Sequence, residues 1–296
     1  MLGRSDYQAH AGAYTGGANA VYWVDIVLKR PDGLVVVRNL TEGAKVQVDQ
    51  VVEPIEPDLL YPLLRGRDVK RWRAEPSALI LMVQDPVKRR GIDEQELQAR
   101  YPRTYGYLKR FEPVLRERAS RGVSDMLKKG APFYTMFAVG TYTFAPWKVV
   151  WPNIASALNA AVIGMAEGKV IVPQHIVTLV ACGNQQEAHY ICALVNSSPA
   201  NFAARAYSQE GGKSFGDPHI LEHIRIPRYD PSDGVHRRLT ELSQEAHAAA
   251  KAGDEKGLRA VEAEIDRQAA KLWGLTDREL REVQQSLREL AGDGTE

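Results

Sequence analysis

The pattern of apolar and polar positions predicts β-strands in the first half of the chain. Residues 22–28 and 34–37 are mostly β-branched, aromatic or otherwise apolar, and the turn sequence Arg-Pro-Asp-Gly lies between them at 30–33. This arrangement is typical of a β-hairpin. Similar short runs predict further strands at 46–52, 79–83 and 149–151, a strand pair around 170–180, and a last strand within 224–231 that ends at a proline.

A helical period appears in two internal stretches. Residues 93–118 carry Leu and Tyr side chains at helical intervals, which Pro102 and Pro113 interrupt, so two or three short helices are predicted. A buried helix is expected over 186–195 because this stretch is apolar and rich in alanine. A second helix is expected after a short turn, followed by a glycine-rich loop at 210–217.

The character of the chain changes beyond residue 231. Residues 235–290 contain no proline, and apolar residues recur there at intervals of three and four. Gly253 and Asp254 divide the repeats into two runs, which predicts an antiparallel helical hairpin and then a short helix capped at Thr276. The seam of the hairpin is assigned to Leu239, Leu242, Val261, Ile265 and Leu272.

These patterns predict an α+β fold in two parts. Residues 1–231 form a strand-rich domain with inserted short helices, and residues 232–296 form the helical hairpin and C-terminal helix, a spacer or a docking element for a partner. The composition is that of a globular protein, with 44% hydrophobic and 25% charged residues among 296. Cys182 and Cys192 are expected to be buried thiols, which suits a reducing cytoplasm. No run of about 18 apolar residues predicts a membrane span, so a cytoplasmic protein without a membrane partner is expected.

The net charge is only +1, so an attraction for polyanions depends on how the charge is distributed. Basic residues clearly outnumber acidic ones over residues 60–121, and Trp72 and several tyrosines are interleaved with them. An arginine fork can grip a phosphate or read guanine in the major groove, so this region is a candidate nucleic-acid surface. The alternative is a solvated face of ordinary salt bridges.

Motifs for catalysis and cofactor binding are not found. The glycines do not have Rossmann spacing, and the sequence "GGKS" lacks the leading glycine of a P-loop because Tyr207 stands there. Neither a His-Glu-x-x-His metal set nor a Gly-x-Ser-x-Gly elbow occurs. The Asn-Pro-Pro-aromatic tetrapeptide of adenine-N6 methyltransferases is also missing, since "WPNI" at 151–154 has a different order. We therefore assign no catalytic residue and no metal ligand to this chain.

Several ordered stretches resemble the target-recognition domain of TaqI-like adenine-N6 DNA methyltransferases, a group that includes the fused type IIG restriction-modification enzymes. The stretches are "GAYTGGANAVYWVD", "LYPLLRGRDVKRW", "YPRTYGYLKRFEPVLRER", "FAPWKVVWP" and "GGKSFGDPHILEHIRIP". The resemblance implies a module that recognises a double-stranded DNA sequence in a restriction-modification or phage-defence system and works with a methyltransferase domain or subunit. That partner would bring S-adenosylmethionine, and Mg²⁺ for cleavage. The helical hairpin is similar to the spacers of type I specificity subunits.

The candidate DNA contacts come from four places in the sequence. The basic stretch and the bases that follow it are expected to reach phosphates and groove edges. The first glycine-rich loop, "AYTGGAN" at residues 13–19, could bring an asparagine to adenine, or be a simple turn. The second glycine-rich loop, at residues 210–217, could hold a phosphate, or be a flexible surface loop. The candidates are Arg65, Arg67, Lys70, Arg71, Lys88, Arg89, Arg90, Tyr14, Thr15, Asn19, Lys213 and Ser214.

Two structural interpretations accompany these assignments. Asp68 is expected to serve as a local cap or to pair with Arg71, and Trp72 is expected in the core. Two other functions stay open. The first is a nuclease or methyltransferase whose active site converges only in the fold, for example around Asp217, His219 and Glu222. The second is a protein-interaction scaffold built on the helical hairpin.

Overall fold

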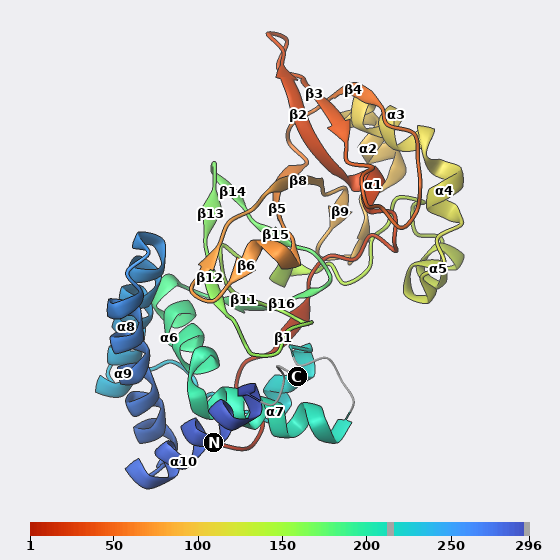
Figure 1. Cartoon of the computed structure of the whole chain (residues 1–296). Helices are drawn as coiled ribbons and strands as arrows, with labels where there is room; N and C mark the ends of the chain where they lie inside the picture. The colour runs from red at the N-terminus through yellow and green to blue at the C-terminus, as the bar shows by residue number, and fades with distance from the viewer. Residues whose placement is uncertain (212–215, 293–296) are drawn as a thin grey trace.

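The computed structural model describes residues 1–211 and 216–292 of the chain. Figure 1 shows a six-stranded sheet in the upper half, a smaller sheet in the middle and a group of helices below. The six-stranded sheet has the order β15-β5-β8-β2-β3-β4, and only the β15–β5 pair is parallel. Its strands are β2 (Trp23–Lys29), β3 (Val35–Asn39), β4 (Val52–Ile55), β5 (Leu60–Leu64), β8 (Ala78–Leu81) and β15 (Val172–Pro173).

The hairpin predicted at the start of the chain is confirmed as β2 and β3, and its outer half projects beyond the neighbouring strands (Figure 1). The strand predicted over 46–52 is wrong, because pairing with β3 begins only at Val52. The Asn39 side chain explains the difference. Its amide donates to the Asp49 carbonyl and its oxygen accepts from the Val51 amide, so this backbone is used in a loop instead of a ladder.

The second sheet is four-stranded and antiparallel, in the order β1-β16-β11-β12. Three two-stranded ribbons complete the β-structure: β6 with β7, β9 with β10, and β13 with β14. The bounds are β1 (Ala9–Ala11), β6 (Val69–Lys70), β7 (Arg73–Ala74), β9 (Gln84–Asp85), β10 (Arg90–Gly91), β11 (Trp147–Pro152), β12 (Ala161–Ile163), β13 (Met165–Ala166), β14 (Lys169–Val170) and β16 (Val177–Cys182).

Two strand predictions in this part of the chain are wrong. The expected pair around 170–180 does not form, because the chain turns at Gln174 and sends β15 and β16 into different sheets. The expected strand within 224–231 is reduced to one bridge between Leu2 and Ile224. Pro227 and Pro231 explain the loss, since proline has no N–H to donate to a ladder.

The short helices predicted over 93–118 are confirmed. Pro102 and Pro113 lie in the first turns of two of them, where a helix does not use the missing N–H. The helices of this half are α1 (Asn19–Tyr22), α2 (Glu94–Arg100), α3 (Pro102–Arg110), α4 (Glu112–Arg116) and α5 (Arg121–Lys128). Three 3₁₀ turns are η1 (Gly66–Asp68), η2 (Thr141–Phe144) and η3 (Pro218–Glu222).

The helical hairpin is also confirmed. Gly253 ends the first helix in the left-handed conformation, with a φ of 71°, and the Asp254 carboxylate caps the second by accepting from the Gly257 amide. Thr276 and Glu279 form the reciprocal cap of the last helix. The helices of this half are α6 (Gln185–Asn196), α7 (Ser198–Gly211), α8 (Gly234–Ala252), α9 (Glu255–Trp273) and α10 (Asp277–Gly292).

Two main hydrophobic cores lie at opposite ends of the molecule. The first joins the six-stranded sheet to α3 and α4, and its buried residues come from 13–139 apart from Val172. The second joins the four-stranded sheet to α6, α7, α8 and α9, and it includes both free cysteines. A smaller cluster lies between them, where Leu64 and Val69 meet Val150 and Leu179. The second core has members on both sides of residue 231, so the boundary expected there stays a prediction.

The described helices include none with the length and apolar character needed to cross a membrane.

Candidate nucleic-acid interface

A groove of about 870 Å³ runs between the β2–β3 hairpin, the loop that follows it, and the segment that contains η1. Its floor includes the turn between β15 and β16. The groove therefore collects residues from five separated parts of the sequence, because Ser77 before β8 also lines it. They are Trp23, Asp25, Arg38, Leu40, Thr41, Glu42, Gly43, Gln50, Arg65, Gly66, Arg67, Ser77, Gln174 and Ile176.

Asp68 organises the arginines of η1. Its carboxylate accepts from the Arg65 backbone amide at 2.8 Å and from the Ser77 hydroxyl, and the Arg65 guanidinium lies 3.5 Å away. The expectation of a local cap is confirmed, but its ionic partner is Arg65 and not Arg71. The Arg67 guanidinium is only within 4.0 Å of Asp68, and 72% of its side chain is exposed. Arg65 is thus held by the fold, whereas Arg67 extends toward solvent.

The polar groups of the groove are mixed in sign. Arg38 lies 3.6 Å from Asp25 across the hairpin, and both side chains are about half exposed. Glu42, Gln50 and other polar side chains add acceptors and donors to the same wall. This combination of arginine forks, amides and carboxylates matches the donors and acceptors that base edges present in a major groove better than it matches a row of phosphates.

Two buried side-chain nitrogens have no hydrogen-bond partner among the described residues, and one of them belongs to a residue that lines this groove. That one is Trp23 Nε1, and the other is His175 Nδ1, whose residue is not part of the lining. An unpaired buried polar atom costs free energy and is rare in folded proteins. Trp23 thus places one unpaired polar atom beneath the wall of the groove.

The first glycine-rich loop divides into an inner and an outer part. Thr15 is buried, and its hydroxyl donates to the Asn19 side-chain oxygen at 2.6 Å, so these two residues stabilise the turn into α1. Tyr14 is partly exposed, and its ring lies 4.6 Å from that of His175. Tyr14 is thus partly exposed beside His175, and neither residue is part of the groove lining.

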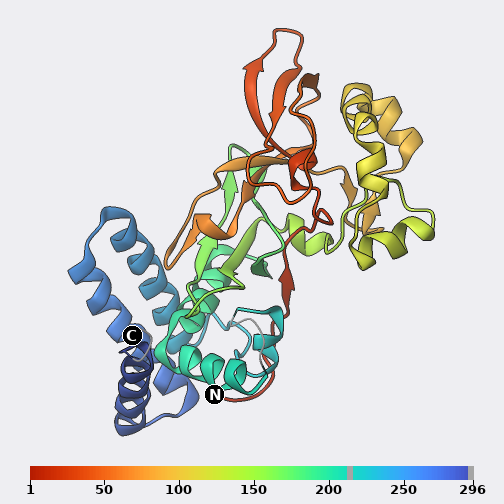
Figure 2. The same cartoon turned by 45° about the vertical axis from the view of Figure 1, so that its right-hand side comes forward.

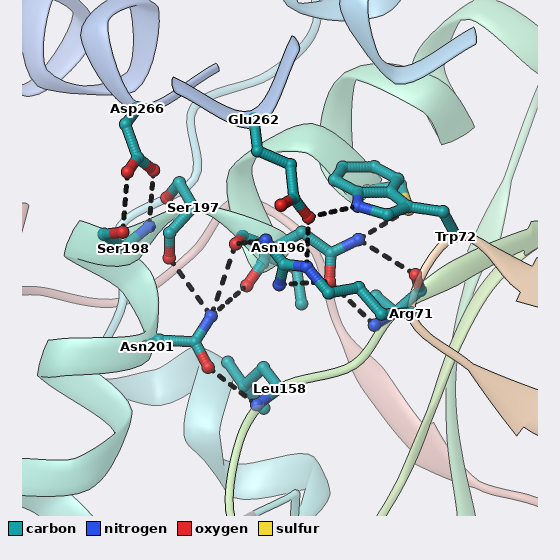
Figure 3. A network of polar contacts seen from close by, with 12 residues as sticks. Arg71, Trp72, Leu158, Asn196, Ser197, Ser198, Asn201, Glu262 and Asp266 are labelled. Carbon is teal, nitrogen blue, oxygen red and sulfur yellow. Dashed lines mark hydrogen bonds and ion pairs between the residues drawn. The ribbon is translucent and has the colours of Figure 1, made fainter. Parts of the chain in front are cut away.

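Arg71 and Trp72 point away from the groove. The Arg71 guanidinium bonds the Glu262 carboxylate and the Asn196 carbonyl, and Trp72 Nε1 donates to the same Glu262 at 2.7 Å (Figure 3). Trp72 is only 1% exposed, as expected of a core residue. Arg71 is thus used in a contact with α9, and we leave it out of the interface. Its neighbour Lys70 is exposed on β6.

The other basic candidates lie outside the groove lining. Lys88 and Arg89 occupy the turn between β9 and β10, where Lys88 is 3.7 Å from Asp85. Arg90 begins β10. The Arg89 guanidinium lies 5.9 Å from the centre of the Tyr142 ring. Lys213 and Ser214 lie outside the described residues.

Arg118 is a structural residue that sequence reasoning counted among the surface bases. It is 5% exposed, and its guanidinium donates to the carbonyls of Leu115, Thr15, Phe133 and Thr135. These bonds tie the first glycine-rich loop to the segment after α5. The sequence carries no signal that separates this arginine from its exposed neighbours.

The cluster considered for catalysis is a surface cap. The Asp217 carboxylate accepts from the His219 amide, and His219 Nδ1 lies 2.9 Å from Glu222 on an exposed surface. Within residues 1–211 and 216–292, no group of three His, Cys, Asp or Glu side chains is arranged to hold a metal ion.

Comparison with known proteins relates the chain to restriction-modification enzymes. It is 26% identical over 146 residues to the type II methyltransferase M.NspV of Nostoc sp., which is 49% of this chain and 29% of that protein. Its fold matches the type IIL restriction-modification enzyme MmeI, solved in complex with DNA, with a TM-score of 0.55, 10% identity, and coverage of 94% of this chain and 36% of that chain. No family model matches. The chain thus spans about a third of either protein, and neither likeness is specific to a TaqI-like recognition domain.

Proposed function

We propose that this chain is the double-stranded DNA recognition module of a restriction-modification enzyme, of the kind that methylates adenine at N6. The observation that carries the proposal is the groove lined by Arg38, Arg65 and Arg67, with the unpaired nitrogen of Trp23 at its wall, in a fold shared with part of a DNA-bound enzyme. Charge alone would not support it, because most of the basic stretch is paired within the protein.

The division of the arginines suggests how the groove would act. Arg65 is held by Asp68 and Ser77, so its geometry is set before DNA arrives and little side-chain entropy is lost on binding. Arg67 is free of such close bonds among the described residues and can turn toward a guanine edge or a phosphate. Exposed bases outside the groove, including Lys70 and Lys88, would contribute backbone contacts.

The partner in this proposal is a methyltransferase domain or subunit. Since the two similar proteins are about three times longer than the matched region, the remainder would supply S-adenosylmethionine binding, methyl transfer and, where cleavage occurs, the Mg²⁺ site. A TaqI-like specificity domain is the finer form of the same proposal.

A titration of the purified chain against a pool of randomised duplex DNA, with sequencing of the bound fraction at two salt concentrations, tests the proposal. We expect a short enriched motif, and a slope of log affinity against log salt of about −4 to −5 if roughly four to six phosphates are contacted. Absence of DNA binding at both salt concentrations would contradict it. Incubation of the chain alone with labelled S-adenosylmethionine and plasmid tests the enzymatic alternative.

A further inference from the structure

Asp25 and Arg38 face each other across the β2–β3 hairpin, and both line the groove. Their side chains are 42% and 47% exposed, and their nearest charged atoms are 3.6 Å apart, which is longer than a hydrogen bond. On its other side, Arg38 has Val52 of β4 as its neighbour, and a valine side chain offers no acceptor. Among the described residues, neither side chain has a hydrogen-bond partner. The carboxylate and the guanidinium therefore keep their hydrogen-bonding capacity for a ligand.

The hairpin presents this pair beside a free edge of the sheet. In the described part of the chain, β8 pairs with β2 at Trp23 and Val24, so from Asp25 onward β2 has a neighbouring strand on one side alone. The hairpin continues from there beyond the neighbouring strands (Figures 1 and 2). Strands read the major groove in several classes of DNA-binding protein. The edge of a base pair can thus approach Asp25 and Arg38 from outside the sheet.

The charges around the pair argue against a phosphate as its ligand. Asp25 offsets the charge of Arg38, and Glu42 adds a second carboxylate to the same lining. A carboxylate repels a phosphate because like charges repel. It accepts instead from N–H groups, and the major groove presents these at cytosine N4 and adenine N6. A base edge is therefore the part of a duplex that suits both members of the pair.

The order of donors and acceptors distinguishes the base pairs. In a G·C pair, guanine presents the adjacent acceptors N7 and O6, and the cytosine N4 amino group follows as a donor. An arginine fork beside a carboxylate is the complement of this order. An A·T pair instead places the adenine N6 donor between the acceptors N7 and thymine O4, so an arginine fork would meet a donor at one of its two positions. The pair thus matches G·C better than A·T.

We propose that Asp25 and Arg38 together recognise one G·C base pair in the major groove. Arg38 donates to guanine N7 and O6, and Asp25 accepts from the N4 amino group of the paired cytosine. The inference rests on the proposed function and adds to it the base pair that this part of the groove selects.

Selection from randomised duplex DNA tests the pair with three single variants. We expect the wild-type motif to contain a G·C pair that both Asp25→Ala and Arg38→Ala cease to specify, while the other positions of the motif are kept. Asp25→Ala removes a negative charge, so its binding to unrelated duplex should not weaken. Asp32→Ala is the matched control, because Asp32 pairs with Arg30 at 2.8 Å on the same hairpin but outside the groove lining. This variant should select the wild-type motif.

A second measurement replaces single guanines of the selected duplex with 7-deazaguanine, which lacks the N7 acceptor and keeps Watson–Crick pairing. At the assigned base pair, wild-type protein should bind about tenfold more weakly after the replacement. Arg38→Ala should bind the two duplexes equally well, because the side chain that reads N7 is already absent. Equal sensitivity of wild type and Arg38→Ala at every guanine would contradict the assignment.

The outcomes separate the two proposals. If Asp25→Ala and Arg38→Ala select the full wild-type motif or relax different positions, or if the wild-type motif contains no G·C pair, the shared reading role is wrong while DNA recognition stands. If wild-type protein binds no DNA, the proposed function fails and the reading role falls with it. Thermal unfolding of each variant checks that the fold is unchanged.

Discussion

Arg67 and Arg71 are four residues apart in one basic stretch, but they have opposite surroundings. The side chain of Arg67 is 72% exposed at the groove, whereas that of Arg71 is 32% exposed and bonded to Glu262 of α9. Trp72 causes the difference. It has a φ of 63° between β6 and β7, its indole belongs to the second core, and the adjacent Arg71 guanidinium bonds the same Glu262 carboxylate (Figure 3). Basic residues that are continuous in the sequence thus lie in two different environments, one exposed at the groove and one paired with a helix.

The buried end of this stretch should dominate stability. Replacing Trp72 with Ala removes a fully buried indole from the second core, and we expect a loss of about 3 to 5 kcal/mol in the free energy of unfolding. Urea denaturation followed by circular dichroism measures the loss. Arg67→Ala is the control from the exposed end and should unfold within about 0.5 kcal/mol of wild type. Equal losses for the two variants would contradict the comparison.

Glu262 should matter more than an ordinary surface carboxylate on the same helix. Glu262→Ala leaves the Arg71 guanidinium and the Trp72 indole without their shared acceptor, and a loss of about 1 to 3 kcal/mol is expected. The matched control is Glu255→Ala, which breaks an exposed pair with Arg259 worth at most about 1 kcal/mol.

A double-mutant cycle of Arg71→Ala and Glu262→Ala, measured by urea unfolding, isolates the pair itself. A coupling energy near zero would show that the two side chains do not stabilise each other.

Substitution at the exposed end of the basic stretch, at Arg67, should affect DNA binding and not the stability of the fold. Arg67→Ala is expected to weaken binding to the selected duplex by roughly 1 to 3 kcal/mol if the fork reads a base. Arg65→Ala should weaken binding and also lower stability slightly, because Arg65 bonds Asp68 and Ser77. Fluorescence anisotropy at one salt concentration, combined with thermal unfolding, separates the two effects. If Arg67→Ala binds as wild type does, the groove assignment is wrong.

Acid should destabilise the buried end of the stretch through two histidines that pack near Trp72. Burial lowers the pKa of His189 to about 3, and the pKa of the adjacent His247, whose ring contacts Trp72, is lowered for the same reason. The unfolded chain takes up protons near pH 6.5 while the folded chain does not, so stability is full above about pH 6.5 and falls as the pH decreases toward 3. Each histidine contributes at most about 1.4 kcal/mol per pH unit.

Unfolding midpoints of wild-type protein and of His189→Gln between pH 7 and 5 measure this effect. We expect a shallower pH dependence in the variant. An identical slope would show that His189 is not a source of the acid sensitivity.

The sequence predicted those elements whose signals are local. The hairpin α8–α9 has its apolar period, its αL glycine and its cap within one stretch of chain, and the short helices around Pro102 and Pro113 are equally self-contained. Strands near 46–52 and 224–231 failed because a side chain or a proline diverted the backbone from pairing. Each failure depends on a single side chain or a proline, and the pattern of apolar residues does not reveal such effects.

The site was predicted only in part, because it forms by convergence. Arg65 and Arg67 were recognised from a local excess of charge, but Trp23, Arg38 and Gln174 join them only when the six-stranded sheet has formed. Arg71 was also expected at the interface, but the fold pairs it with Glu262, which lies in a helix distant in the sequence.

The division between the two main cores has a consequence for engineering. The first core draws on 13–139 and Val172, and Trp72 is the one fully buried residue of that stretch that belongs to the second core. The chain leaves the helical half after β1 and returns at β11 (Figures 1 and 2), and β15 later rejoins the six-stranded sheet beside β5. The stretch between β1 and β11 could therefore be exchanged between related proteins if β15 is exchanged with it. Such a graft must keep Trp72, which packs in the core of the helical half. It must also keep Leu64 and Val69, which pack where the two sheets meet.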